Sequence, residues 1–275
     1  MTGTAVVFLA RGRDGGRRSA EIFLDSYRTH KTRPAADLVV VVKGWHGVLG
    51  LEDVRRSARA VSASVVELPD NGYDFGAYFR IAAQLDHAWL CLLNTHSRIL
   101  ADDWLDKLLA TAERPGIGAA GATGSWGSLT PRWRGPGASV LGRIAWPLRF
   151  VAAIRRFPRF PNPHLRSNAL IISRRTFVSF ADAGRLPSGK ADAQFLESGR
   201  GGLTAFLRSR GLRTVVVGAD GQSFEVEDWI ASGTFRVPGQ ANLMIADNQT
   251  RAYEGADRSM RRILEFAAWG KTLTL

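Results

Sequence analysis

Residues 37–42 read DLVVVV, and residues 4–10 read TAVVFLA. Uninterrupted apolar runs of this kind, rich in β-branched residues, are typical of strands that are buried on both faces of a sheet. Amphipathic stretches follow the apolar runs, at residues 17–28, 51–60 and 75–85. Strands that alternate with helices predict βαβ units, and therefore a mostly parallel sheet that is covered by helices on both faces.

The alternation continues along the rest of the chain. It predicts further strands at residues 64–68, 89–93, 117–121, 169–173 and 214–217. It predicts further helices at residues 103–112, 201–210 and 257–269, the last docked through Met260, Ile263, Leu264 and Phe266. We expect one Rossmann-like α/β domain over residues 1–218 and a C-terminal extension over residues 219–275 that packs on the same domain.

The composition is that of an ordinary globular protein, with 45% hydrophobic and 23% charged residues in a chain of 275. The single cysteine, Cys91, lies inside the apolar run AWLCLL, which excludes a disulfide framework and a cysteine-based zinc site. No apolar run approaches ~18 residues, and Met1 is not followed by the basic start of a signal peptide. We therefore expect a cytoplasmic protein.

The net charge of +12 comes almost entirely from one segment. No acidic residue lies between Glu113 and Asp182, whereas eleven arginines do. Without these eleven, the other 26 of the 37 basic residues nearly balance the 25 acidic residues. The middle of the segment is an insertion, residues 126–166, in which arginines alternate with large apolar side chains such as Trp146 and Phe150.

A segment in which basic and apolar side chains alternate can bind at the surface of an anionic membrane or to a phosphate-bearing lipid. We expect residues 132–166 to hold the protein at such a surface, on the inner face of the cell membrane. The alternative is an irregular insertion that is folded over the core, with its arginines solvated. No helix-turn-helix, zinc-finger or RNA-recognition signature is present, so we expect no nucleic-acid partner.

Ligands of open α/β sheets bind at the carboxyl ends of the strands, so the residues that follow each strand are the candidate site. The loop that begins at Arg11 contains glycines but lacks both the P-loop lysine and the dinucleotide-binding pattern. The turn at residues 69–77 presents Asp70, Asn71 and Asp74, which suit sugar hydroxyls or a pyrimidine base. Asp74 alternatively caps the next helix.

The strand at residues 89–93 ends in the polar residues Asn94, Thr95 and His96. The helix that follows is expected to be capped by Asp102 and to be seated on the sheet by Trp104 and Leu105.

Together these stretches resemble a known family. The turn N-G-x-D-x-G (Asn71 to Gly76), the run L-N-T-x-S-x-x-L from residue 93 and the helix W-L-x-K-L-L from residue 104 are similar to bacterial GT-A-type glycosyltransferases. The sequence is most similar to glycosyltransferase family 2 and to rhamnan-synthesis enzymes that build surface polysaccharides. The resemblance covers residues 4–218. It implies a GT-A-like fold and a nucleoside-diphosphate-sugar donor that is bound by Arg11 and the turn and strand-end residues named above.

The resemblance places Asn94, Thr95 and His96 where these enzymes carry a D-x-D motif for a divalent metal and the diphosphate. An asparagine and a histidine stand here in place of the carboxylates. Mg²⁺ and Mn²⁺ prefer oxygen ligands, so the substitution weakens the inference of either metal, with His96 as its one candidate ligand.

The stretch F-L-E-S-G-R at residues 195–200 resembles the acidic motif that supplies the general base in these enzymes. Ser198 stands in place of the second acid, so the role falls to Glu197. A carboxylate that takes the proton of an acceptor hydroxyl is what inverting transfer requires. The alternative for Glu197 is an ion pair with Arg200.

Six further residues are candidates for contacts with the acceptor or the diphosphate: Arg166, Asn168, Arg200, Arg236, Asp247 and Asn248. Asp247 and Asn248 alternatively form a helix cap or a turn. The sequence thus predicts a glycosyltransferase that transfers a sugar to a glycan or lipid-linked acceptor. The alternative function is a catalytically inactive module that binds a sugar nucleotide or a glycan.

Overall fold

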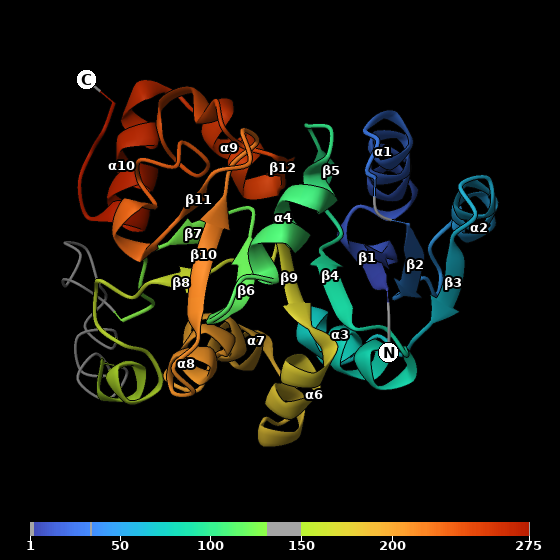
Figure 1. Ribbon diagram of the computed structural model, residues 1–275, viewed down its shortest axis with the longest axis horizontal. Coiled ribbons are helices and arrows are strands. Elements are labelled where there is room, and N and C mark those ends of the chain that lie inside the picture. Colours follow the sequence, from blue (N-terminus) through green and yellow to red (C-terminus); the bar gives the residue numbers. More distant parts are fainter. Residues whose placement is uncertain (1–2, 34, 131–149, 275) are drawn as a thin grey trace.

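The computed structural model describes residues 3–33, 35–130 and 150–274. Its centre is an eight-stranded sheet with the order β11-β10-β6-β9-β4-β1-β2-β3 (Figure 1). The strands are β1 (Thr4–Arg11), β2 (Ala36–Lys43), β3 (Ser64–Glu67), β4 (Trp89–Leu93), β6 (Ile117–Gly121), β9 (Ala169–Ser173), β10 (Arg213–Val217) and β11 (Ser223–Phe224). Arg132, Arg134, Arg143, Trp146 and Arg149, all from the basic insertion, lie outside the described residues.

The sheet is mostly parallel, as the sequence predicts. β4, β1, β2 and β3 run parallel to one another, and β10 runs parallel to β6. β9 is antiparallel to both of its neighbours, and β11 is antiparallel to β10. Because β9 is reversed, its first residues lie at the same edge of the sheet as the carboxyl end of β4.

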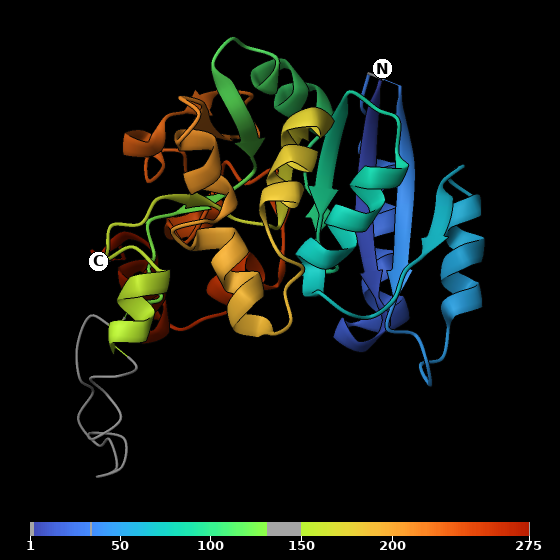
Figure 2. The same cartoon turned by 90° about the horizontal axis from the view of Figure 1, so that it is seen from below.

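Helices cover both faces of the sheet, which is the predicted α/β architecture (Figures 1 and 2). On one face, alternate strand residues such as Phe8 and Val40 pack against α1 (Gly16–Thr29), α2 (Leu51–Arg59) and α4 (Trp104–Ala112). On the other face, residues such as Leu9 and Val41 belong to a second core. That core includes side chains from α3 (Tyr73–Gln84), α6 (Arg174–Ala183), α7 (Lys190–Ser198) and α8 (Leu203–Arg208).

The C-terminal extension joins the rest of the fold at several points. β11 extends the main sheet, and β12 (Ile245–Ala246) pairs with β5 (Arg98–Ile99). The short strands β7 (Gly124–Ser125) and β8 (His164–Leu165) form a third sheet. Two helices, α9 (Asn248–Glu254) and α10 (Arg258–Trp269), complete the chain, and no described helix is long and apolar enough to cross a membrane.

Two local predictions are wrong. Asp103, not Asp102, occupies the N-cap position of α4, and the Asp102 carboxylate contacts His30 Nδ1 at 3.1 Å instead. α10 does not dock through its apolar stripe, because Met260, Ile263 and Phe266 are 47%, 59% and 49% exposed.

The face of α10 that packs inward carries Glu265 and Trp269. Glu265 accepts hydrogen bonds from Tyr253 Oη and Leu273 N, and Trp269 Nε1 donates to the Phe235 carbonyl. These hydrogen bonds select the buried face of α10 in place of its most apolar one.

The contact between α1 and the sheet generates a test of the core. Phe23 on α1 stacks on Phe8 of β1, with ring centroids 3.8 Å apart and both rings fully buried. We expect Phe23→Ala to lower the free energy of unfolding by about 3 to 5 kcal/mol, because it removes a large buried ring and leaves a cavity. Urea denaturation measures the loss.

The matched control is Ile22→Ala on the same helix, where the side chain is 37% exposed. The control is expected to cost less than about 1 kcal/mol, since a partly exposed side chain leaves no closed cavity. Equal losses in the two variants would contradict the assigned packing of α1.

Candidate active site

A cleft with two chambers lies at the edge of the sheet where β1 and β4 end and β9 begins. The first chamber has a volume of about 200 Å³, and the second has a volume of about 260 Å³. Arg166, Glu197 and Gln249 line both of them. The second chamber is also lined by Arg236. The first chamber is also lined by seven predicted site residues: Asp74, Asn94, Thr95, His96, Asn168, Asp247 and Asn248.

A third cavity, of about 470 Å³, holds the remaining predicted donor contacts. Arg11, Asp70 and Asn71 line it. Arg11 Nε donates to Asp70 Oδ1 at 2.9 Å, and so joins the ends of β1 and β3. Arg200 is an exposed residue that lines none of these cavities, and its Nε donates to the Ile154 carbonyl.

Glu197 lies in the last turn of α7. Its Oε1 accepts a hydrogen bond from the backbone nitrogen of Ser167 at 2.7 Å, which fixes the carboxylate against the start of β9. Its predicted alternative, an ion pair with Arg200, is not among the ion pairs of the described residues. The side chain is partly exposed, so it faces the cleft while its position is held by the backbone.

Arg166 and Asp247 form a buried ion pair, with Nη2 and Oδ2 separated by 2.6 Å and side chains only 7% and 1% exposed. Asp247 is also the N-cap of α9, where it accepts hydrogen bonds from the backbone nitrogens of Gln249 and Thr250. Burial opposes ionisation of this carboxyl, but Arg166 and Thr250 outweigh burial and hold its pKa below the ordinary value. Asp247 therefore caps a helix, as one of the two alternatives from the sequence predicts, and the same carboxylate anchors Arg166.

The turn after β4 uses its polar atoms internally. Asn94 Oδ1 accepts hydrogen bonds from the His96 backbone nitrogen and from Ser97 Oγ. Burial and the neighbouring Arg251 guanidinium lower the pKa of His96, so the imidazole is neutral at pH 7. Asn168 Oδ1 accepts from Thr123 Oγ1, and its Nδ2 points toward the Ile245 carbonyl.

A divalent metal fits this set of side chains poorly. Within the described residues, no group of three His, Cys, Asp or Glu side chains is placed to hold a metal ion. The amide oxygen of Asn94 is engaged in its own turn, and His96 offers nitrogen where Mg²⁺ and Mn²⁺ prefer oxygen. We therefore assign no step of the chemistry to a metal.

Lys43 is a residue of this region that the sequence analysis missed. Its side chain is fully buried, and Nζ donates to the Tyr73 carbonyl at 2.7 Å and lies 3.7 Å from Asp70 Oδ1. Burial lowers the pKa of this amine. Lys43 thereby holds the turn between β3 and α3. In the sequence, the one feature that could have indicated a buried role is its position directly after a run of four valines.

Other residues of the cleft were also missed, among them Asp14, His164, Ser167 and Gln249. His164 contacts the Asn162 carbonyl through Nδ1, and burial lowers its pKa. Gln249 belongs to a polar cluster that is visible in the sequence, but nothing there distinguishes it from its neighbours.

Asp74 is not the N-cap of α3, because Gly72 occupies that position. Its carboxyl lies in the first turn of the helix and lines the first chamber. Burial raises the pKa of Asp74 to about 6, Lys43 opposes the shift, and Glu197 adds to it. The first chamber therefore holds a carboxyl that titrates close to neutral pH.

The raised pKa of Asp74 generates a pH-dependent prediction. Between the ordinary pKa of 3.8 and the folded value of about 6, the folded state binds more protons than the unfolded state. Stability therefore falls as the pH rises through this window. We expect Asp74→Asn to be more stable than the wild type at pH 8, by about 1 to 3 kcal/mol, and to lose this advantage near pH 4.

Thermal denaturation between pH 4 and pH 8 measures the difference. Asp182→Asn, at an exposed position on α6, is the matched control and is expected to follow the wild-type profile. An Asp74→Asn profile that runs parallel to the wild type would show that this carboxyl is ionised throughout the range.

No protein-family model matches this sequence, and no curated protein sequence matches it. Three solved structures illustrate the similar folds. A mannosyltransferase from Pyrobaculum calidifontis, in complex with GDP-Man and Mn²⁺, is 13% identical with a TM-score of 0.49, over 84% of this chain and 59% of that one. A CMP:2-keto-3-deoxy-manno-octonic acid synthetase, in complex with CTP, is 11% identical with a TM-score of 0.46, over 82% of this chain and 94% of that one.

The third is a glucosyl-3-phosphoglycerate synthase from Mycobacterium tuberculosis, in complex with Mn²⁺, UDP-glucose and phosphoglyceric acid. It is 18% identical with a TM-score of 0.37, over 64% of this chain and 57% of that one. The chain thus spans less than two thirds of the mannosyltransferase and of this synthase. Likenesses this distant carry no information about the substrate, and the similarity to glycosyltransferase family 2 stays a resemblance.

Proposed function

We propose that this chain is a glycosyltransferase, which moves a sugar from a nucleoside-diphosphate donor to a hydroxyl of a glycan or lipid-linked acceptor in surface polysaccharide biosynthesis. The observation that carries the proposal is the place of Glu197 in the wall that the two chambers share. A carboxylate in that place can take a proton from a hydroxyl in one chamber while a group from the other chamber is transferred.

The donor is assigned to the first chamber and the cavity beside it. Carboxylate and amide oxygens at Asp74, Asn94 and Asn168 suit the hydroxyls of a sugar, which donate hydrogen bonds. Arg11, Asp70 and Asn71 line the cavity assigned to the nucleoside. Thr95, His96 and Asn248 complete the first chamber on the side assigned to the diphosphate.

The acceptor is assigned to the second chamber, so that its hydroxyl faces Glu197. The hydroxyl oxygen attacks the anomeric carbon, its proton passes to the Glu197 carboxylate, and the bond to the nucleoside diphosphate breaks. The leaving group departs with the bonding electron pair, opposite to the attacking oxygen, so that the configuration is inverted. The Ser167 hydrogen bond orients the carboxylate for this proton transfer.

The decisive variant is Glu197→Gln. We expect it to lower the rate of sugar transfer ~10²–10⁴-fold, because it removes the general base, and to leave the affinity for UDP-, dTDP- or GDP-sugars within about twofold. Transfer to a lipid-linked or glycan acceptor measures the first quantity, and calorimetric titration of the donor measures the second.

Glu113→Gln is the matched control, since Glu113 is exposed at the end of α4 and lines neither chamber. Glu197→Gln with more than about half of the wild-type rate would remove Glu197 from the role of base. A wild-type chain that binds sugar nucleotides but neither transfers nor hydrolyses them would establish the alternative, an inactive binding module.

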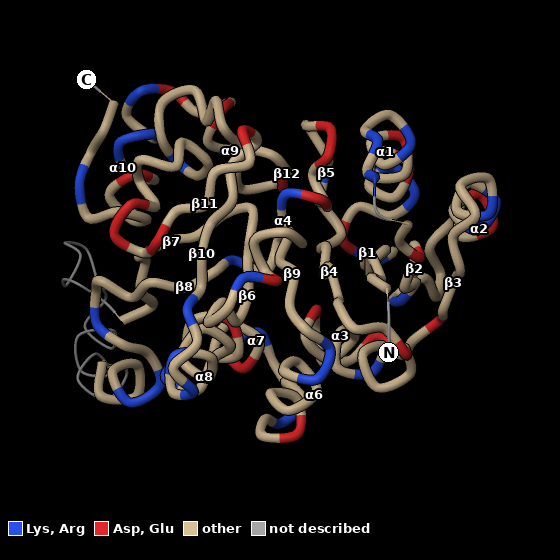
Figure 3. The backbone as a smooth tube through the Cα atoms, in the orientation of Figure 1, with Lys and Arg blue, Asp and Glu red and all other residues tan. Residues whose placement is uncertain are grey.

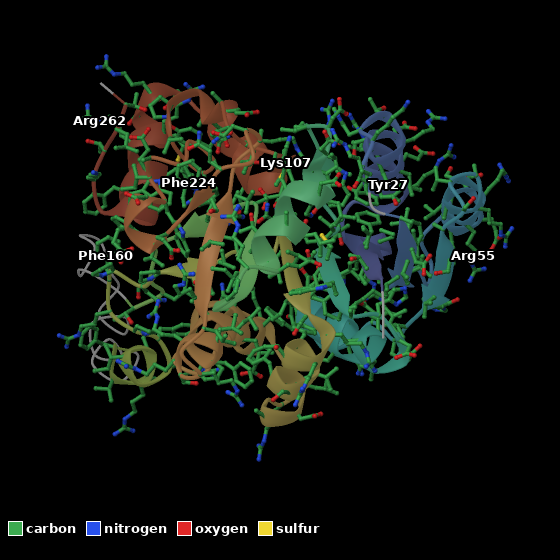
Figure 4. The ribbon with its side chains drawn as sticks, viewed as in Figure 1. Tyr27, Arg55, Lys107, Phe160, Phe224 and Arg262 are labelled. Atoms are coloured by element: carbon green, nitrogen blue, oxygen red, sulfur yellow. The ribbon has the colours of Figure 1, made fainter. Side chains whose placement is uncertain are left out.

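We propose in addition that the protein is cytoplasmic and peripheral at an anionic membrane surface. The described end of the basic insertion supports this, because Val151, Arg155 and Arg159 are exposed around the helical residues 150–156. The exposed apolar stripe of α10 adds support. Basic residues are frequent along α10 and residues 150–159 (Figure 3), and Arg262 of α10 and Phe160 lie at the same end of the molecule (Figure 4).

We expect co-sedimentation with phosphatidylglycerol vesicles, weaker binding to phosphatidylcholine vesicles, and loss of binding at high salt. Each basic residue near the surface contributes ~1 kcal/mol, so changing Arg149, Arg155 and Arg159 to Ser should weaken binding at least tenfold. Arg156 is left in place because it pairs with Asp192 at 2.7 Å.

The control changes three exposed arginines elsewhere, Arg18, Arg59 and Arg208, to Ser. It removes the same charge and is expected to keep most of the binding. Equal binding of the wild type to both kinds of vesicle, or to neither, would refute the membrane assignment.

A further inference from the structure

Arg236 has a backbone conformation that its own side chain does not favour. Its φ of +46° lies in the left-handed region, which costs a residue other than glycine of order 1–3 kcal/mol. The surrounding structure holds it there, because the Arg236 nitrogen donates to Gln240 Oε1 at 3.0 Å and its carbonyl accepts from Trp269 Nε1 at 3.2 Å. This backbone directs the guanidinium to the second chamber.

The guanidinium of Arg236 is only partly satisfied. Nη2 donates to Gln249 Oε1 at 3.1 Å and Nη1 lies 3.4 Å from the Leu264 carbonyl, but Nε is buried without a hydrogen-bond partner. Among the described residues, no carboxylate lies within ion-pair distance of it. Burial and the nearby Arg166 lower the pKa of Arg236 to about 10, so it stays charged at pH 7.

The other charges of the second chamber are already matched or assigned. Arg166 is paired with Asp247, and Glu197 is bound by the Ser167 nitrogen. His164 is neutral at pH 7, because burial lowers its pKa. Ser125 and Gln194 add a hydroxyl and an amide to the lining. In the described wall, the charged groups without an ion-pair partner are thus Glu197, which is assigned to the proton transfer, and the cation of Arg236.

We propose that the second chamber is a subsite for an anionic group, a phosphate or a carboxylate, that the acceptor carries close to its reacting hydroxyl. Arg236 offers its terminal nitrogens to the anion, Arg166 flanks it, and Glu197 faces the hydroxyl. A guanidinium forms short, charge-assisted hydrogen bonds to such groups through these nitrogens. The assignment to the acceptor rests on the proposed transferase function.

The same cation is less well placed for the diphosphate of the donor. Arg236 lines the second chamber and not the first, whereas the donor is assigned to the first. The first chamber also contains Asp14 and Asp74, whose carboxylates suit the hydroxyls of the donor sugar.

The test compares acidic and neutral probes of one size. Glycerol 3-phosphate, glycerate and glycerol are titrated calorimetrically into the wild type, into Arg236→Gln and into the control Arg59→Gln, which lies on exposed α2. We expect at least one acidic probe to bind tenfold or more tightly than glycerol, and Arg236→Gln to abolish this preference. A parallel titration with dihexanoyl phosphatidic acid distinguishes a lipid-borne phosphate from a free one, and UDP reports separately on the first chamber.

A second measurement uses the wild-type protein, so it does not depend on whether the Arg236→Gln variant folds. In the wild type, the ¹H–¹⁵N resonance of Arg236 Nε, identified by its absence in Arg236→Lys, is expected to shift when the preferred acidic probe is added. A resonance that does not move, or acidic probes that bind no better than glycerol, would overturn the subsite.

The two proposals fail in different ways. Weakened UDP binding in Arg236→Gln with unchanged binding of acidic probes would assign Arg236 to the donor and overturn the inference, while leaving the transferase proposal standing. Anion binding through Arg236 without any nucleotide binding would support the subsite and contradict the proposed function.

Discussion

The buried ion pair between Arg166 and Asp247 joins two parts of the chain that are 81 residues apart. Removing one partner would leave an uncompensated buried charge, which typically costs about 3 to 5 kcal/mol. Asp247 simultaneously caps α9, and this places Gln249 in the first turn of that helix. Gln249 in turn holds the guanidinium of Arg236, so the positions of both arginines of the cleft depend on this one pair.

The two chambers differ in the sign of the charge that is left uncompensated. Asp74 in the first chamber and Arg236 in the second are in no ion pair of the described residues, whereas Asp14 is paired with Arg11. Glu197 lies where the two meet, and its charge contributes to the raised pKa of Asp74. We expect this separation to orient the proposed acceptor, with its acidic group toward Arg236 and its reacting hydroxyl toward Glu197.

The central strands were predictable because they are buried on both faces, so that each forms a continuous apolar run in the sequence. The strands at residues 89–93, 117–121 and 169–173 have the predicted bounds. α6 and α7 were not anticipated, although Phe177, Phe180 and Leu196 give them buried apolar positions. For α10 the apolar pattern pointed to the wrong face, since the hydrogen bonds of Glu265 and Trp269 decide which side packs inward.

The site was predictable only where it follows directly from the strand ends. Asp74 and Asn94 lie in the cleft for this reason, because parallel strands carry their ends to one edge. The reversal of β9, which brings Asn168 to the same edge, depends on pairings between distant segments that no local pattern encodes. The left-handed backbone of Arg236 likewise depends on Gln240 and Trp269, which act through tertiary contacts.

The buried amine of Lys43 bears on the chemical reactivity of this protein. The chain has five lysines and 32 arginines, so acylating reagents that modify amines find few targets. The Lys43 side chain is fully buried under the turn between β3 and α3, so we expect its amine to react only when that turn opens. We therefore expect the acylation rate of Lys43, relative to that of an exposed lysine such as Lys271, to measure how often the turn opens. This turn forms one wall of the cavity assigned to the nucleoside.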